Sequence, residues 1–262
     1  MSRSIKILLL VFTIVLVGKS VAYAIEAKEI VYKAQEAVYY QAQDGRSKVN
    51  MVITDSLGRE REREMIILRK NSEGKEQKYY VYFEKPNDVK GMTYLVWKNP
   101  ASDDDRWLYL PALDLVRRVA SNDKRASFVG SNFAYEDISG RSSEEDEHEL
   151  ISSLDGEYRI KSIPKNPESV EFSYFETLIN KDNFIPVKAE YYDKNGDKYK
   201  IIELLEVQDI GGFPTVVKMK ATDLNSGGST VSVFSDVEYD IGVDNSIFTE
   251  RYLRRPPRKF IK

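Results

Sequence analysis

The chain has 262 residues, with 39 basic and 42 acidic side chains, one histidine and no cysteine. The missing cysteines exclude disulfides, thiolate metal sites and cysteine nucleophiles, and we also expect no lipid anchor of the bacterial lipoprotein type, which needs a cysteine. The formal net charge of −3 argues against nucleic acid as the main partner.

The first 24 residues have the layout of a secretory signal peptide. Two basic residues precede an apolar run over residues 7–17, and the sequence A-Y-A at residues 22–24 forms a cleavage site. An uncleaved membrane anchor is the alternative, but the run would make only about 16 Å of helix against a hydrocarbon core of about 30 Å. We therefore expect cleavage after Ala24, a periplasmic location and a single mature domain over residues 25–262.

One amphipathic helix and then a long series of strands are predicted in the mature chain. Apolar residues recur at helical spacing over residues 26–42, and Asp44-Gly45 ends the helix. Strand patterns follow, and Asn195-Gly196 is the clearest hairpin signal. The candidate strands are residues 49–54, 60–69, 78–84, 92–98, 106–110, 115–119, 148–153, 158–163, 170–180, 186–193, 198–207, 214–222 and 230–239. We expect an α+β, mainly β fold, with one curved antiparallel sheet of about eleven strands and the helix on its concave side.

Aromatic residues are abundant, with 17 Tyr, 11 Phe and two Trp. Many of them fall on both faces of candidate strands, at residues 79–83, 92–97 and 107–110. Such strands are either covered by protein on both faces or present one face to a ligand. Composition leaves both interpretations open, because aromatic residues also favour ordinary β-sheet cores.

Three segments depart from the strand pattern. Between residues 110 and 138 the pattern breaks around Pro111 and Gly130, and a loop of this length in a compact domain is usually functional or mobile. Residues 142–149 collect five acidic side chains, which we interpret as a solvated, flexible linker, with Ca²⁺ capture as the alternative. Residues 254–262 form a basic tail that is either solvated or a site for anionic lipid head groups or an acidic partner.

The residues offer little chemistry for catalysis or metal binding. The single histidine, His148, lies in an acidic run, so a Ser-His-Asp triad or a two-histidine metal site has only this residue to use. Residues 193–197 look like a Ca²⁺ loop, but the glycine is misplaced and Leu204 stands where a bidentate glutamate is needed. Residues 103–105, three consecutive aspartates, fit a solvated loop. We expect no enzyme, no cofactor and no metal, although paired carboxylates for glycoside hydrolysis stay open.

A dense block of motifs resembles one known family. It consists of Phe83, Pro86 and Gly91, then D-R-W-L-Y-L-P at residues 105–111, V-R-R at 116–118, S-F-V-G-S at 127–131 and Y-E-D at 135–137. This block resembles the outer-membrane lipoprotein-sorting protein family, the LolA-like group, and the resemblance extends over nearly the whole mature chain. It implies an unclosed barrel of about eleven antiparallel strands, with helices as a lid over a hydrophobic cavity that receives acyl chains.

The resemblance also implies a function in lipid transport. We expect a periplasmic carrier that binds the acyl chains of a lipoprotein or lipid and helps sort it toward the outer membrane. A lipid exporter of the resistance-nodulation-division type is an implied partner, and we expect peripheral membrane contact. An envelope regulator that senses lipids or lipoproteins, and a structural β domain without ligand, are the alternatives.

The carrier hypothesis predicts a cavity lined by side chains of the central strands, with residues 110–138 as a movable cover. The predicted lining residues are Phe83, Leu95, Trp97, Trp107, Tyr109, Phe128 and Phe133. Arg117 and Arg118 are candidates for contact with a phosphate head group, with surface or structural pairing as the alternative. Strand parity is not determined by the sequence, so the face on which each residue lies stays open.

Overall fold

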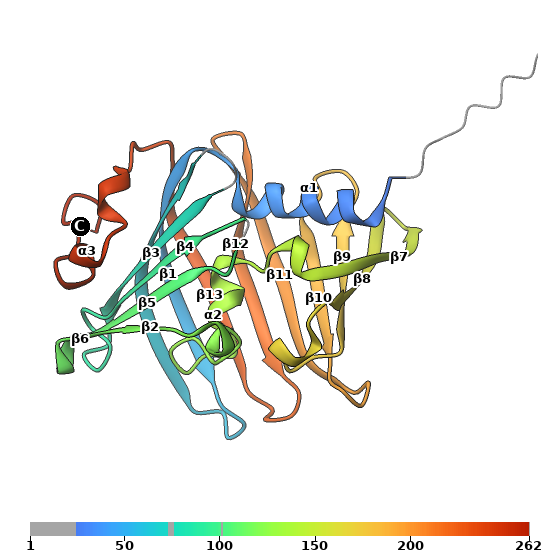
Figure 1. Ribbon diagram of the computed structural model, residues 1–262, viewed down its shortest axis with the longest axis horizontal. Coiled ribbons are helices and arrows are strands. Elements are labelled where there is room, and N and C mark those ends of the chain that lie inside the picture. The colour runs from blue at the N-terminus through green and yellow to red at the C-terminus, as the bar shows by residue number, and fades with distance from the viewer. Residues whose placement is uncertain (1–24, 73–75, 101, 262) are drawn as a thin grey trace, which may run out of the picture.

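The computed structural model describes residues 25–72, 76–100 and 102–261, apart from the side chain of Asn122. The expected signal peptide, residues 1–24, lies outside the described residues. Figure 1 shows one large, strongly curved sheet with the N-terminal helix lying across one of its faces. None of the helices in the described ranges is long and apolar enough to cross a membrane.

The sheet has thirteen strands, and all paired neighbours are antiparallel. The strands are β1 (Asp44–Thr54), β2 (Glu60–Asn71), β3 (Gln77–Lys85), β4 (Thr93–Lys98), β5 (Asp105–Leu110), β6 (Leu115–Arg118), β7 (Asp146–Leu154), β8 (Glu157–Pro164), β9 (Tyr174–Asn180), β10 (Pro186–Tyr192), β11 (Lys198–Ile210), β12 (Phe213–Asp223) and β13 (Ser229–Tyr239). Their order across the sheet is β6-β5-β4-β3-β2-β1-β13-β12-β11-β10-β9-β8-β7. Pairing of β1 with β13 joins the two halves, and β6 and β7 are the edges of a sheet that is not closed into a barrel.

The predicted fold class is confirmed, with a small difference in strand number. The sheet is antiparallel, curved and unclosed, as expected, but it has thirteen strands instead of about eleven. Each candidate run pairs as a strand of its own, including the short β6, which pairs with β5 through four residues. The turn at residues 193–197 is the expected hairpin, in which the Asp193 carboxylate accepts hydrogen bonds from the backbone of Asn195 and Asp197.

The helices lie on both sides of the sheet. α1 (Ala27–Tyr39) and α2 (Tyr135–Ser139) cross the concave face, and α3 (Glu250–Arg254) packs near β4 and β5. The described 3₁₀ turns are η2 (Pro111–Leu113), η3 (Ser121–Asp123), η4 (Ser143–Glu145), η5 (Pro167–Ser169) and η6 (Asn245–Ile247). In α1, Ile30 and Ala34 are one turn apart and buried against Ile160 and Ile179 of the sheet, so helical periodicity sets which face of α1 meets the strands.

Two apolar clusters lie on opposite faces of β2–β5. Tyr79, Val81 and Phe83 of β3 point to the concave face, and the alternate residue Tyr80 points to the convex face. On the convex side, Tyr80 packs with residues of the C-terminal segment such as Leu253, which is fully buried. The aromatic residues on both faces of these strands therefore reflect strands that are covered by protein on both sides.

Two segments that were predicted to be solvated are instead packed. Residues 142–149 form η4 and the start of β7. Asp146 is buried, and its carboxylate accepts hydrogen bonds from Arg141 at 2.8 and 2.9 Å. The flexible-linker interpretation of this segment is therefore wrong. The basic tail, residues 254–262, is also not simply solvated, because Pro257 and Phe260 are buried while most of its basic side chains stay exposed.

Candidate ligand-binding cavity

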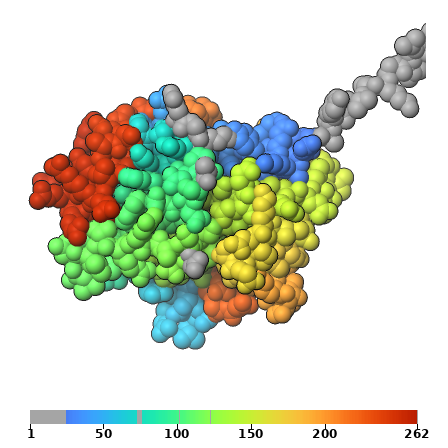
Figure 2. Space-filling view, in the orientation of Figure 1, coloured from blue at the N-terminus to red at the C-terminus, as the bar shows by residue number. Residues whose placement is uncertain are grey.

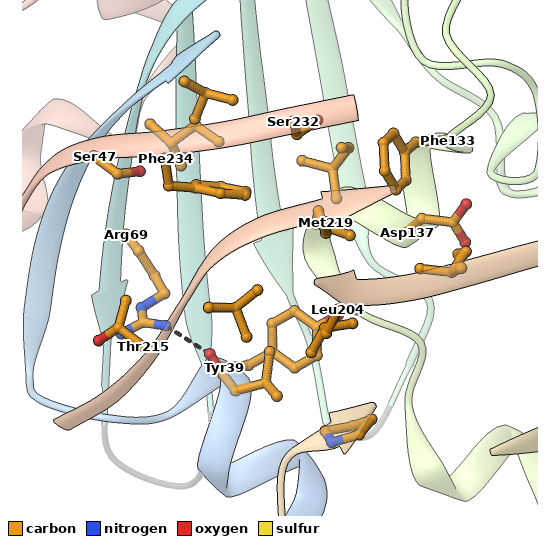
Figure 3. Close-up of a pocket in the computed structure, with 18 of the residues that line it drawn as sticks. Tyr39, Ser47, Arg69, Phe133, Asp137, Leu204, Thr215, Met219, Ser232 and Phe234 are labelled. Carbon is orange, nitrogen blue, oxygen red and sulfur yellow. Dashed lines mark hydrogen bonds between the residues drawn. The ribbon is translucent and has the colours of Figure 1, made fainter. Parts of the chain in front are cut away.

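A cavity of about 330 Å³ lies between the concave face of the sheet, the C-terminal part of α1 and the segment that contains α2. This volume falls at the lower end of the range of about 300–1,000 Å³ that is usual for small-molecule sites. Figure 3 shows side chains from β1, β2 and β11–β13 around it, together with Tyr39 of α1 and Asp137 of α2.

The middle of the cavity is apolar because residues of equal parity on neighbouring strands face the same side. Val49 of β1 lies opposite Met65 of β2 and Phe234 of β13, and Met51 of β1 extends the same surface. Met219 of β12 adds a third methionine. Methionine side chains are flexible and polarisable, so this surface can adapt to alkyl chains of different shape.

Polar groups gather at the end of the cavity beside the last turn of α1. Arg69 of β2 donates hydrogen bonds to the backbone oxygens of Val38 at 3.3 Å and Gln41 at 2.6 Å. Its guanidinium carbon lies 6.0 Å from the centre of the Tyr239 ring. The hydroxyl oxygens of Thr215 and Tyr239 are 2.9 Å apart. The cavity is therefore amphipathic, with an apolar middle and hydrogen-bonding groups at this end.

A buried network of ion pairs borders the cavity on the side of α2. Asp137 pairs with Lys200 of β11 and with Arg125, whose Nη1 lies 2.9 Å from its carboxylate. Arg125 Nη2 also lies 2.9 Å from Glu171. Burial alone would raise the pKa of Asp137, but Lys200 and Arg125 lower it to about 2. Asp137 is therefore ionised at neutral pH and ties α2 to the sheet.

The same network continues from α2 to β7. Glu136 of α2 contacts Lys124 at 3.1 Å and Arg141 at 3.2 Å, and Arg141 in turn pairs with Asp146 of β7. Burial opposes ionisation of Glu136, but Arg141, Arg125 and Lys124 lower its pKa. The segment that was expected to be a movable cover is thus held to the sheet by paired charges.

Tyr39 and Gly140 form a close contact where α1 meets the segment after α2. Both residues line the main cavity and a second, smaller one of about 100 Å³ next to it. Gly140 has φ +79°, and a Cβ placed there would lie 3.0 Å from the Tyr39 ring. Only glycine fits both this backbone conformation and this approach, so the contact fixes the Tyr39 ring between the two cavities.

Comparisons with known proteins agree with this architecture. A crystal structure of a DUF1329 family protein from Desulfovibrio piger superposes with a TM-score of 0.80 at 29% identity, covering 87% of this chain and 97% of that one. A domain from Vibrio parahaemolyticus, described as an outer membrane lipoprotein-sorting protein, gives 0.79 at 26% identity, covering 87% and 98%. A LolA superfamily protein from Nitrosomonas europaea gives 0.69 at 22% identity, covering 87% and 100%, and this last likeness concerns the fold.

A family model whose description reads "-like: Uncharacterized protein" matches residues 75–255. The chain belongs to this family, and its fold is LolA-like. No curated protein matches the chain.

The LolA-like structure places three of the predicted lining residues on the concave face. Phe133 lines the cavity itself. Phe83 and Phe128 belong to the same apolar cluster, with ring centroids 5.8 Å apart, but they are fully buried and do not line the cavity. They therefore support the cavity from the side of β3 and residues 124–134.

The other four predicted lining residues lie on the opposite face. Leu95, Trp97, Trp107 and Tyr109 pack in the convex cluster, under the C-terminal segment. The Trp97 indole donates a hydrogen bond of 2.8 Å to the Phe248 backbone oxygen, and the Trp97 and Trp107 rings lie 5.0 Å apart at their centroids. The expected position of these four residues is wrong, because the parity of β4 and β5 turns them away from the cavity.

Arg117 and Arg118 do not line the cavity either. Both are exposed on β6, the edge strand, and Arg118 pairs with Asp105 of β5. Any contact they make with a head group would be at the surface of the molecule and not inside the cavity.

Most of the cavity lining was not predicted, because the predicted residues all lie between residues 83 and 133. The lining residues Met219, Phe234 and Arg69 lie on strands that were predicted, but which face of each strand meets the cavity was not. The alternation of Ser232 and Phe234 with exposed Val233 in β13 is the signal that could have been used. It becomes informative only after one residue of the strand is known to face the cavity.

Proposed function

We propose that this LolA-like protein is a periplasmic carrier that binds the acyl chains of a lipoprotein or lipid in its concave cavity and helps sort the cargo toward the outer membrane. The observation that carries the proposal is the amphipathic cavity under α1, which has an apolar surface built from β1, β2, β12 and β13. The likeness to a lipoprotein-sorting domain supports it.

The physical need for a carrier follows from the hydrophobic effect. Burial of a chain of about sixteen carbons is worth on the order of 13 kcal/mol at about 0.8 kcal/mol per CH₂, so such a chain does not cross water unaided. A carrier must shield the chain and also release it. In this structure α1 provides shielding, and its apolar contacts with the sheet are concentrated at Ile30 and Ala34.

The surface also offers a way for the carrier to meet a membrane. The C-terminal segment exposes Arg251, Arg255 and Arg258. This segment lies near the exposed Leu113 of the β5–β6 turn, because Arg254 forms an ion pair of 3.0 Å with Asp114 of that turn. Figure 2 shows the C-terminal residues forming one end of the molecule. Basic side chains with an exposed leucine suit peripheral contact with anionic lipids.

A lipid exporter of the resistance-nodulation-division type is the proposed membrane partner, on the strength of the sequence resemblance. Crosslinking in intact cells, followed by affinity purification of the mature chain, would test it. Recovery of such an exporter in stoichiometric amount supports the partnership, and its absence when the cargo is present argues against it.

The experiment that tests the carrier is native mass spectrometry of the protein purified from the periplasm without detergent, followed by organic extraction. We expect a stoichiometric lipid adduct that is lost in Phe234→Asp, which puts a charge on the cavity wall. Val233→Asp is the matched control, because Val233 is 42% exposed and faces away from the cavity on the same strand. Unliganded wild type in repeated preparations, with no uptake of a fluorescent fatty acid, would leave a structural β domain as the conclusion.

A further inference from the structure

The cations of the concave face differ in how they are neutralised. Arg125, Arg141 and Lys200 each contact at least one carboxylate in the network around α2. Arg69 contacts two backbone oxygens and the Tyr239 ring, and it lies beside the Tyr79 hydroxyl. No carboxylate forms an ion pair with it within 4.0 Å in the described part of the chain. It is thus a cation at the cavity wall without an anionic partner.

Part of the guanidinium also lacks a hydrogen bond. Arg69 Nε is buried and has no partner among the described residues, although guanidinium carries five N–H donors. A buried donor without an acceptor, on a group whose charge is only partly balanced by carbonyl dipoles, is costly. An anion that enters the cavity at this end would supply the missing charge.

The neighbours of Arg69 suit the head of an amphiphile. The Thr215 and Tyr239 hydroxyls lie at the same end. In Figure 3, Arg69 and Thr215 lie together beside Tyr39, whereas Met219 and Phe133 lie farther along the cavity. A ligand with an alkyl chain on the apolar surface would therefore place its polar end near Arg69.

We propose that Arg69 recognises an anionic head group, so that the cavity selects amphiphiles ending in a carboxylate or a phosphate ester over neutral ones. This inference rests on the proposed carrier function and names its ligand class. The anion pairs with the guanidinium of Arg69, which lines the cavity. The contacts of Arg69 with Val38 and Gln41 orient the guanidinium toward the ligand.

The test uses the delipidated mature chain, loaded with the neutral fluorescent probe N-phenyl-1-naphthylamine, and three competitors with the same C18 chain. These are oleate, 1-oleoyl lysophosphatidate and oleyl alcohol. We expect oleate or the lysophosphatidate to displace the probe from the wild type at a concentration at least about tenfold lower than oleyl alcohol requires. Stronger displacement by oleate indicates a carboxylate site, and stronger displacement by the lysophosphatidate indicates a phosphate site. A tenfold preference corresponds to about 1.4 kcal/mol.

The variant Arg69→Met should lose this preference, and a circular dichroism spectrum that matches the wild type shows that it remains folded. Arg69→Lys should keep part of the preference because the charge is retained. Arg159→Met is the matched control, since Arg159 pairs with Glu176 outside the cavity lining, and it should behave like the wild type.

Two results would overturn the inference while the carrier function stands. One is equal displacement by oleate, the lysophosphatidate and the alcohol in the wild type, and the other is an unchanged anion preference in Arg69→Met. Failure of the probe and of all three lipids to bind would overturn the carrier function, and this inference with it.

Discussion

Buried charged residues account for the position of α2 against the sheet. Arg125 joins Asp137 of α2 to Glu171 and also lies 5.4 Å from the centre of the Tyr191 ring. Each of these ions is tolerated only because its partners are in place, since an isolated buried charge is strongly unfavourable. Changing one member therefore affects stability more than the same change at the surface.

The variant Arg125→Met should lower the free energy of unfolding by on the order of 3–5 kcal/mol, because it leaves Asp137 and Glu171 without their shared cation. Urea unfolding followed by circular dichroism measures the change. Arg159→Met removes a partly exposed pair with Glu176 and should cost no more than about 1 kcal/mol. Similar losses in the two variants would contradict a stabilising role for the buried network.

The pH dependence of stability follows from Asp137. Its pKa is about 2 in the folded protein, against an ordinary value of 3.8. A pKa that is lower in the folded state stabilises the protein above the unfolded value, and this contribution is lost as the pH falls from about 4 through about 2. The difference in unfolding free energy between wild type and Asp137→Asn should therefore shrink by roughly 1 kcal/mol between pH 6 and pH 3. A pH-independent difference would show that Asp137 is not stabilised as an anion.

At the scale of elements, the contact between α1 and the turn after α2 closes one side of the cavity. Tyr39 is in the last turn of α1, and Gly140 directly follows α2. Burial, followed by the charges of Asp137 and Glu136, raises the pKa of the Tyr39 phenol, so Tyr39 stays neutral at physiological pH. A neutral aromatic ring packed on a glycine thus connects two helices that border the cavity.

The variant Gly140→Ala tests the contact between Gly140 and Tyr39. Its positive φ alone costs about 1–3 kcal/mol for a residue with a Cβ, and contact with the Tyr39 ring adds to that cost. Gly156→Ala provides the control, because Gly156 has a nearly equal φ of +78° but nothing within 4 Å of an added Cβ. Thermal or urea unfolding should show a larger loss for Gly140→Ala, with weaker probe binding only in that variant. Equal losses and equal binding would exclude a role for the Tyr39 contact.

At the scale of the whole molecule, charge is unevenly distributed. The chain is acidic overall, yet residues 250–262 contain six basic side chains and one acidic one. Apolar residues of this segment are buried on the convex face, and hydrogen bonds from Tyr80 and Thr93 to the backbone of Tyr252 and Leu253 hold it there. The segment therefore presents its arginines from a fixed position and not from a free tail.

Replacing Arg251, Arg255 and Arg258 together by Ala should weaken binding to anionic liposomes by on the order of 3 kcal/mol, or about 100-fold, at about 1 kcal/mol per basic residue. Liposome sedimentation at low and physiological salt measures this, and the wild-type affinity should fall as salt rises. Replacement of the exposed Lys28, Lys165 and Lys194 is the control with equal charge change. Equal effects of the two triple variants would point to net charge and not to a docking surface.

Much of the architecture was predictable from local patterns. The helix over residues 26–42, the runs that became thirteen strands and the hairpin at Asn195-Gly196 were visible in the sequence, because periodicity and turn residues are local properties of the chain. The motif block over residues 83–137 also indicated the LolA-like fold correctly. Tertiary contacts overrode local polarity where acidic residues 142–149 and the basic C-terminus found partners or buried their apolar neighbours.

The candidate site was decided by tertiary structure. Trp97 and Trp107 were as plausible as Phe133 for the cavity lining, but a shift of one residue in strand parity reverses the face of every side chain, and only the register of the assembled sheet resolves it. Arg69 gave no signal in the sequence, because its importance depends on which carboxylates are near it in space. The sequence by itself determined the elements and their order, since these follow from local spacing. Tertiary structure alone decided which residues meet in the cavity, since pairing between β1 and β13 brings together residues about 180 positions apart.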